Sequence, residues 1–342
     1  MLSRPPTGKR CFLCRRPLRD VVATEEHVFP RWLLKSLDLY QHSLTLANDT
    51  SLKYGHFRVP CCSACNALGE RELEGPISRA FRQGYDAVVK LDHRTLALWC
   101  VKIYYGIRFK EHLFPRDRRR PNRGRITRRR ELDELGLLFM VLQGIRTNIR
   151  YTTEPWSVWV YRLKVPDPVE ERFSFADLVG VSMFSIRIND VGIIVLPRDF
   201  GLVKNSEFGI NFDGFLNETL HPQQFNELAA RAAYYDIIRK IGVSYLVSYE
   251  TPPLVMFVGS LASTPWSEWD WDEYYRVLAF ISKIPTKVWQ PTPDLRWTLL
   301  EDDRGNFIDV PLSAVPAVAR GTERWVNEVP DNKLPNSDVP TA

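Results

Sequence analysis

The sequence lacks any run of apolar residues that approaches the roughly 20 needed to span a bilayer as a helix. Its first residues, Met1 to Pro6, also lack the apolar core of a signal peptide. We therefore expect a cytoplasmic protein with no membrane segment. In a reducing compartment, its six cysteines are expected to be metal ligands or buried thiols rather than disulfides.

Internal repeats and phosphate-binding loops are also missing, which excludes solenoid folds and the common nucleotide-binding motifs. A chain of 342 residues is long enough for two domains. Its mixed patterns predict an α+β protein. We expect a cysteine-containing unit at 8–75, a helical segment at 76–150, an α+β domain at 151–325 and a polar tail at 326–342.

Local patterns place the main elements along the chain. A first strand is expected to end at Glu26-His27, where Pro30 stops it, and a second strand at His56–Pro60 leads to a helix from Asn66. Further predicted elements are a buried helix at Leu96–Phe109, an amphipathic helix at Glu131–Arg146, a hairpin turning at Asn189-Asp190, a helix at Pro222–Ile241, a helix at Ser267–Ile284 with Ser267 as N-cap, and a hairpin at Trp297–Val310.

Charge is divided unevenly along the chain. Residues 1–150 hold 29 Lys and Arg against 15 Asp and Glu, a net +14, while the remainder carries a net −9. Nine arginines fall within residues 116–130, where Asp117 is the only acidic residue. A solvated charged loop is the plain interpretation; an unpaired arginine run that binds phosphates is the one we favour. The predicted nucleic-acid contacts are Arg118, Arg119, Arg120, Arg123, Arg125, Arg128, Arg129 and Arg130.

Two Cys-x2-Cys pairs stand near the N-terminus, at Cys11-Phe-Leu-Cys14 and Cys62-Ser-Ala-Cys65. Each pair puts two thiolates on one tight turn, and two pairs complete the closed four-cysteine set of a structural zinc ion. Cys61 could replace Cys62, although with a wider spacing to Cys65. The sixth, Cys100, lies in an apolar helix and reads as a small buried hydrophobe.

Between the pairs lies Glu26-His27-Val28-Phe29-Pro30, and Asn66 follows the second pair directly. At these residues the sequence resembles the HNH (His-Me finger, ββα-metal) endonucleases, in the branch whose finger is stapled by four cysteines. The resemblance covers about a fifth of the chain and implies an N-terminal ββα-metal finger. The fold class expected is thus α+β: this finger with structural zinc, a helical middle segment and a mixed α+β C-terminal domain.

The chemistry of such a finger assigns roles to these residues. A neutral imidazole accepts a proton from water near pH 7, so His27 is the candidate general base; the bland alternative is a surface or core histidine. By resemblance, Glu26 and Asn66 hold a catalytic Mg2+ or Mn2+, and Asn48 organises the hairpin. Asn66 could instead cap its helix, and Asn48 could be a turn residue.

The sequence therefore predicts a metal-dependent endonuclease that hydrolyses phosphodiester bonds, with double-stranded DNA favoured over RNA on family grounds. A zinc-stabilised nucleic-acid-binding protein without catalysis is the alternative, since it would keep the cysteines and arginines and ignore His27. The acidic C-terminal domain has no catalytic signature, and a regulatory ligand or protein partner there would fit the charge division.

Overall fold

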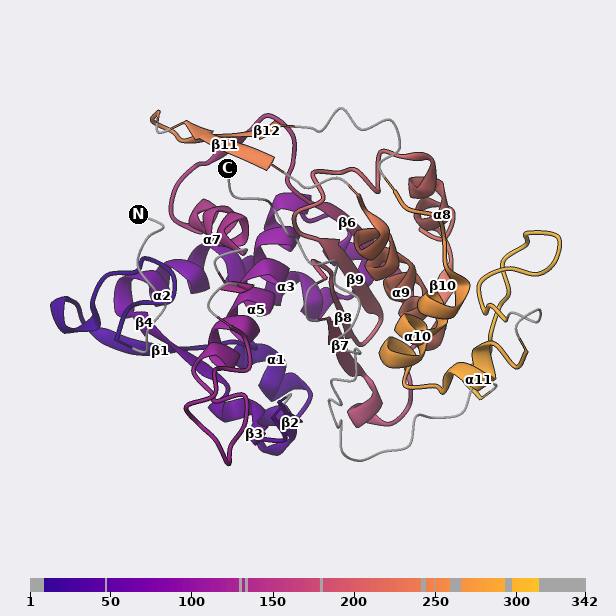
Figure 1. Cartoon of the computed structure of the whole chain (residues 1–342), viewed down its shortest axis with the longest axis horizontal. Helices are drawn as coiled ribbons and strands as arrows, with labels where there is room; N and C mark the ends of the chain where they lie inside the picture. Colours follow the sequence, from indigo (N-terminus) through magenta and orange to yellow (C-terminus); the bar gives the residue numbers. More distant parts are fainter. Residues whose placement is uncertain are drawn as a thin grey trace, which may run out of the picture.

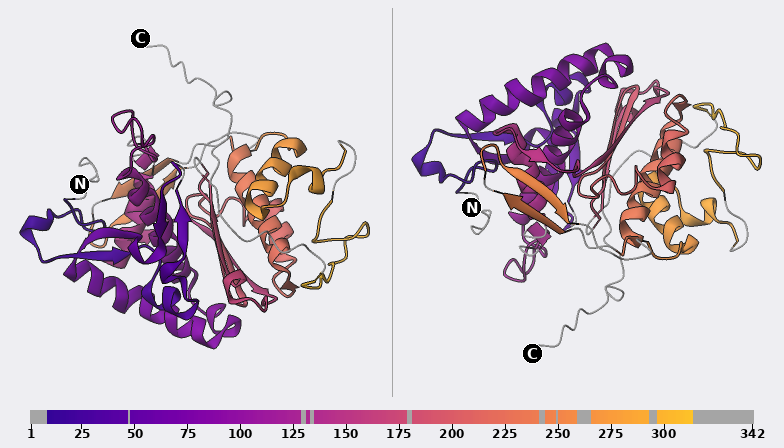
Figure 2. Two further views of the ribbon diagram at one scale, coloured as in Figure 1. Left: turned by 90° about the horizontal axis from the view of Figure 1, so that it is seen from below. Right: turned by 90° about the horizontal axis from the view of Figure 1, so that it is seen from above.

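The chain forms an α+β structure in three layers, seen in a computed structural model that describes residues 9–46, 48–128, 131–132, 135–178, 181–240, 244–248, 250–258, 266–292 and 297–313. A five-stranded sheet stands in the middle (Figures 1 and 2), with helices of the N-terminal half on one face and two C-terminal helices on the other. The predicted tail at 326–342 lies outside the described residues.

The strands are β1 Ala23–His27, β2 Ser43–Thr45, β3 Ser51–Lys53, β4 Arg58–Cys62, β5 Arg150–Tyr151, β6 Ser157–Leu163, β7 Phe173–Asp177, β8 Phe184–Ile188, β9 Val191–Leu196, β10 Thr219–Leu220, β11 Ser244–Ser248 and β12 Leu254–Val258. The helices are α1 Arg31–Ser36, α2 Ser63–Gly69, α3 Gly75–Gln83, α4 Tyr85–Val88, α5 His93–His112, α7 Gly136–Leu142, α8 Ile210–Asp213, α9 Pro222–Ile238, α10 Trp271–Ser282 and α11 Thr286–Trp289. A π-helical turn, Glu70–Glu74, joins α2 to α3.

The N-terminal unit has the strand–strand–helix order that the sequence predicts. Strand β1 pairs antiparallel with β4, so that Glu26 lies opposite Val59 and His27 opposite Arg58. Helix α2 follows β4 at once and begins at Ser63, three residues before the expected start at Asn66. Hairpin and helix together carry three of the four predicted site residues.

The central sheet has the strand order β10-β6-β9-β8-β7. Along β6, Val158 and Val160 pack toward the N-terminal helices, whereas Trp159 and Tyr161 pack with α9 and α10. Side chains alternate across a strand, so a sheet covered on both faces reads as a nearly continuous apolar run. The β8–β9 hairpin turns at Asn189-Asp190 as predicted, with Asn189 in the left-handed region that asparagine tolerates.

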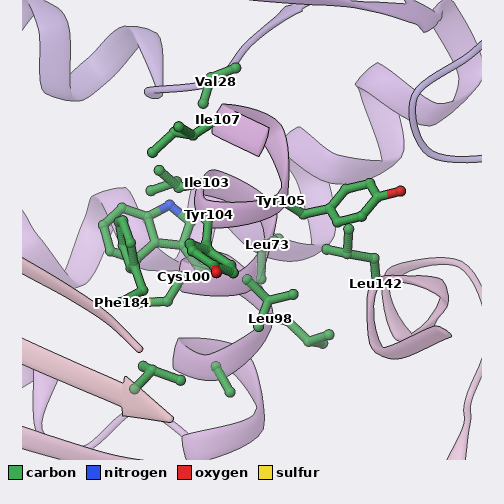
Figure 3. Packing of buried hydrophobic residues seen from close by; sticks show 14 of the residues in the cluster. Val28, Leu73, Leu98, Cys100, Ile103, Tyr104, Tyr105, Ile107, Leu142 and Phe184 are labelled. Atoms are coloured by element: carbon green, nitrogen blue, oxygen red, sulfur yellow. The ribbon is translucent and has the colours of Figure 1, made fainter. Parts of the chain in front are cut away.

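Helix α5 lies between the N-terminal hairpin and the sheet. Figure 3 shows Tyr104 beside Phe184 of the sheet and, around the helix, Tyr105 beside Leu142 of α7. Asp92 caps α5, since its carboxylate accepts from the backbone N–H groups of the first turn, at 3.2 and 3.3 Å. Although α5 is long, none of the described helices is apolar over enough of its length to cross a membrane.

The helix expected at Glu131–Arg146 is present among the described residues as α7, Gly136–Leu142, and the 3-10 turn that continues it, Gln143–Ile145. Two other predicted elements differ in the structure. The N-cap of α10 is Asp270, not Ser267; its carboxylate accepts from the N–H groups of Asp272 and Glu273 at 2.9 and 3.1 Å, whereas the Ser267 N–H donates to Ile238. The hairpin expected at Trp297–Val310 reduces to one bridge, between Glu301 and Phe307.

A buried ion cluster joins α5 to the sheet. Arg108 lies 2.9 Å from Glu111 and 2.8 Å from Asp177 on β7, and all three side chains are at most 8% exposed. Thr127 donates to the same Glu111 carboxylate at 2.8 Å. Removing the cation of such a cluster leaves two carboxylates buried and unpaired.

We expect Arg108→Met to lower the free energy of unfolding by about 3–5 kcal/mol, because Asp177 and Glu111 lose their buried counter-charge. Urea unfolding of the full chain measures this loss. Arg19→Met is the matched control, since the Arg19–Asp20 pair is 86% and 56% exposed and is worth at most about 1 kcal/mol. Equal losses of unfolding free energy in the two variants would contradict the role of Arg108 as a buried counter-charge.

A second stability prediction concerns pH. His221 precedes α9, and its Nδ1 accepts a hydrogen bond from the Gln223 backbone N–H at 3.0 Å. Burial lowers the pKa of His221 from 6.5 to about 4. Between these values the unfolded chain binds a proton at this histidine and the folded chain does not, so stability falls as pH falls.

His221→Asn keeps a capping acceptor and removes the titration. Relative to wild type, this variant should gain up to about 2 kcal/mol of unfolding free energy between pH 7 and pH 5. Urea unfolding at the two pH values measures the gain, and a difference between the proteins that does not change with pH would refute it.

Candidate metal centre and adjoining histidine site

Four cysteines meet where the N-terminal turn approaches the start of α2. The sulfur atoms of Cys11, Cys14, Cys62 and Cys65 all lie within 4.8 Å of one another, and all but Cys14 are buried. Two backbone N–H groups, those of Cys14 and Cys62, point at the Cys11 sulfur from 3.4 Å. The group could hold one metal ion such as zinc, as predicted from the spacing.

The positions of the sulfur atoms favour Cys62 over Cys61 as the fourth member of the group. The sulfur of Cys62 lies 3.8 Å from that of Cys14 and completes the group. The Cys61 sulfur lies 3.9 Å from Cys11, outside the quartet. Hydrogen bonds from the thiols of Cys61 and Cys65 lower the pKa of Cys11 below its usual range.

His27 ends β1 on the side of the hairpin that carries two arginines. Its side chain is only 6% exposed, and the Arg31 Nε donates to its Nδ1 at 3.3 Å. Burial, with the nearby charges of Arg58 and Arg31, lowers the pKa of His27 to about 4. The ring is therefore neutral near pH 7, which is the state that a general base requires.

The tautomer of His27 follows from that hydrogen bond. Because Nδ1 accepts from Arg31, the ring proton resides on Nε2. Nε2 is buried and has no hydrogen-bond partner among the described residues. Arg31 therefore orients the ring, and the edge of Tyr40 meets it at a ring-centroid distance of 6.3 Å.

Glu26 points to the other face of the hairpin. Its carboxylate forms an ion pair with the Lys102 ammonium, which also pairs with Glu74. The three side chains are 12%, 6% and 7% exposed. Burial raises the pKa of Glu26 and Lys102 opposes the rise. Burial alone would lower the pKa of Lys102, but the two carboxylates outweigh it, and the amine stays charged.

The two predicted asparagines have structural partners. Asn66 donates from Nδ2 to the Thr24 hydroxyl at 3.3 Å and to the Glu25 carbonyl oxygen at 3.2 Å, which ties α2 to β1. Asn48 donates to the Pro115 carbonyl oxygen at 2.7 Å, while its own Oδ1 accepts from the backbone N–H two residues on, at 3.1 Å. It is thus a turn residue that also holds a distant segment.

The predicted Mg2+ or Mn2+ ligands, Glu26 and Asn66, are each bonded to other groups of the chain. The Glu26 carboxylate is held by Lys102 on a buried face, and the Asn66 amide group is bonded to the β1 backbone and Thr24. An ammonium group already supplies the positive charge next to Glu26, so a divalent ion at the same carboxylate would meet it at close range. The residues present do not fit the predicted catalytic ion.

The arginine run forms an arm that leaves the end of α5 and returns beside it, with Pro115 bridged to Arg125. In Figure 1 this arm hangs below α5 next to β2 and β3, where Asn48 binds its base. Within the described part of the arm, Arg128 is the arginine with an acidic partner, Glu131. The exposed predicted contacts are Arg118, Arg119, Arg120, Arg123, Arg125 and Arg128; Arg129 and Arg130 lie outside the described residues.

Sequence reasoning missed the residues that surround His27 and Glu26. Strand alternation was the available signal for Glu25, which shares the face of His27 and lies 3.5 Å from Arg58. Pairing across the hairpin brings Arg58 opposite His27, but its register is not visible in the sequence. Nothing local pointed to Lys102, which lies 76 positions from Glu26.

Comparison with known proteins adds no assignment: no protein-family profile matches the chain, and no curated protein or solved structure is significantly similar to it.

The cysteine group generates a test of ligand identity. We expect the purified protein to contain one equivalent of metal, zinc by the preference of four thiolates. Cys62→Ser should lose at least half of it, because one sulfur of the quartet is gone. Cys61→Ser, its matched neighbour, should retain it. Metal analysis of the two variants decides which cysteine is the ligand. Loss of metal from Cys61→Ser alone would make Cys61, and not Cys62, the fourth ligand.

Proposed function

We propose that the protein is an endonuclease that hydrolyses phosphodiester bonds, in DNA by the resemblance of its finger to HNH enzymes. One observation carries this proposal: a neutral histidine, His27, stands between Arg31 and Arg58 at the end of a hairpin that four cysteines tie to the following helix. A base and two fixed positive charges are what attack on a phosphate diester requires.

The described residues support the following sequence of steps. A phosphate binds to the guanidinium groups of Arg31 and Arg58, which donate hydrogen bonds to its oxygens in a forked geometry. As Arg31 turns to the phosphate, it releases Nδ1 of His27. That nitrogen then takes a proton from water while the water oxygen attacks phosphorus. The 3′ oxygen leaves and takes a proton from solvent, giving 5′-phosphate and 3′-hydroxyl ends.

The metal content of this proposal is limited to zinc. Four thiolates close a tetrahedral site, so the zinc ion would be structural and would fix the ends of the finger relative to each other. The Mg2+ or Mn2+ expected on Glu26 and Asn66 has no part in the steps above, because Lys102 holds Glu26.

The arginine arm supports a nucleic-acid partner. Its exposed guanidinium groups could bind phosphates on either side of the scissile bond, and Asn48 fixes the base of the arm to the β2–β3 turn. Such contacts release counterions, so binding should weaken steeply with salt and depend little on base sequence.

A second function has its own observation. His27 is 6% exposed and Glu26 is committed to an ion pair, so the finger could bind nucleic acid through its arginines without cleaving it. In that case the zinc group and the arm carry the function, and His27 is a packed, neutral side chain.

Cleavage of supercoiled plasmid separates the two functions. Wild type should cut, and His27→Ala should cut 10²- to 10⁴-fold more slowly, the usual loss for a general base. His56→Ala is the control, since His56 is an exposed histidine in the turn Tyr54–His56 that precedes β4, and its loss should leave the cleavage rate unchanged. Assays with Mg2+, with Mn2+ and without added divalent ions ensure that activity is not missed.

Equal zinc content in all three proteins would show that the fold survives. Cutting by His27→Ala at the wild-type rate would remove His27 as the base. No cutting by wild type, with salt-sensitive DNA binding retained, would favour the binding protein instead.

A further inference from the structure

We propose that the ammonium group of Lys102 is the resident cation of this finger, fixed between Glu26 and Glu74 where a divalent ion would otherwise bind. The proposal deepens the proposed function by naming the cation of the same finger. It rests on the proposed function only in treating Glu26 as the expected ligand of a catalytic ion. Its test measures metal binding and not cleavage.

The position of Lys102 follows from one stripe of α5 that faces the hairpin. Residues 102, 106 and 110 are four apart and share a helix face. At the middle position, Gly106 lets α5 approach Val28 so closely that an added Cβ would lie 3.1 Å from the valine side chain. Lys110 donates to the Arg58 carbonyl oxygen at 2.8 Å. Contacts at three successive turns of α5 therefore hold the helix, and Lys102 with it, against the β1–β4 hairpin.

The second carboxylate is delivered by a break in helix geometry. Between α2 and α3 the chain makes a π-helical turn, Glu70–Glu74, directly before Pro76. Proline has no N–H to donate and its ring crowds the carbonyl four residues back, which accounts for the widened turn. The turn directs Glu74 inward, where its side chain is 7% exposed and pairs with Lys102.

The surroundings suit an ammonium group rather than a hydrated ion. Apart from Glu26, the side chains around the small pocket beside Lys102 offer no oxygen ligand; they are those of Phe12, Leu13, Cys61, Cys65 and Ile145. Mg2+ requires six oxygen ligands, and the ammonium group of Lys102 occupies the space between the two carboxylates that would supply the first of them. Two carboxylates and one ammonium carry a net −1, so Lys102 already compensates one of the two buried negative charges.

Manganese binding to the intact, zinc-loaded chain tests the proposal. Loss of the free Mn2+ signal in electron paramagnetic resonance would be titrated for wild type, Glu26→Gln and Glu72→Gln. Glu72 is the matched control, because its side chain lies on the same turn but is 51% exposed. We expect equal binding by all three proteins. One Mn2+ equivalent bound by wild type and lost only in Glu26→Gln would overturn the proposal.

Lys102→Ala provides the reverse test. Without the ammonium, the two carboxylates should bind one added Mn2+ equivalent at least tenfold more tightly than wild type, and adding Glu26→Gln should abolish the gain. A folded Lys102→Ala protein with no gain would overturn the proposal. Where that variant does not fold, the wild-type and Glu26→Gln comparison decides.

These outcomes are distinguishable from those of the plasmid assay. Absence of cutting with unchanged manganese binding would remove the nuclease and leave the lysine assignment standing. If cutting depends on His27 and wild type binds a manganese ion that Glu26→Gln does not bind, the nuclease stands and the lysine assignment falls.

Discussion

The packing of α5 between the N-terminal hairpin and the central sheet is the contact on which the other parts of this protein depend. One side of the helix reaches the hairpin through Lys102, Gly106 and Lys110, and Arg108 joins it to β7. The arginine arm begins where the helix ends. A change that loosened α5 would therefore disturb the N-terminal hairpin, the arm and the sheet together, although they are distant in sequence.

Burial leaves the two neighbouring residues Glu26 and His27 in different charge states. Both lose water, but Glu26 meets a fixed ammonium and remains an ion pair, whereas His27 meets guanidinium groups and stays neutral. A neutral imidazole beside two arginines favours phosphate binding and base chemistry. The adjacent carboxylate of Glu26 lies on the opposite face of the hairpin, where it forms a buried ion pair with Lys102.

The charge division between the halves of the chain has a structural counterpart. The basic half forms the hairpin, α5 and the exposed arm, while the acidic half forms most of the sheet and the helices behind it (Figure 2). The phosphate-binding surface we propose thus lies away from α9 and α10. The role of the acidic half as the site of a regulatory partner stays a prediction.

Several features could be read from the sequence because they depend on neighbouring residues. Two Cys-x2-Cys turns predict their own geometry, and the four sulfurs do gather into one group. The order strand, strand and helix around Glu26-His27 and Asn66 was also predictable, since alternation, proline and helix periodicity are local. So was the turn at Asn189-Asp190, where asparagine tolerates a left-handed backbone.

Other features were decided only by the fold. Spacing left Cys61 and Cys62 open, and the fold placed the sulfur of Cys62 with the other three. Strand alternation puts Glu26 and His27 on opposite faces, but nothing near them in the sequence revealed that Lys102 would pair with the glutamate. Such contacts join residues far apart in the chain, and their free energy comes from burial that exists only once α5 has packed. Sequence therefore determined which chemical groups are present, and tertiary structure decided which of them meet.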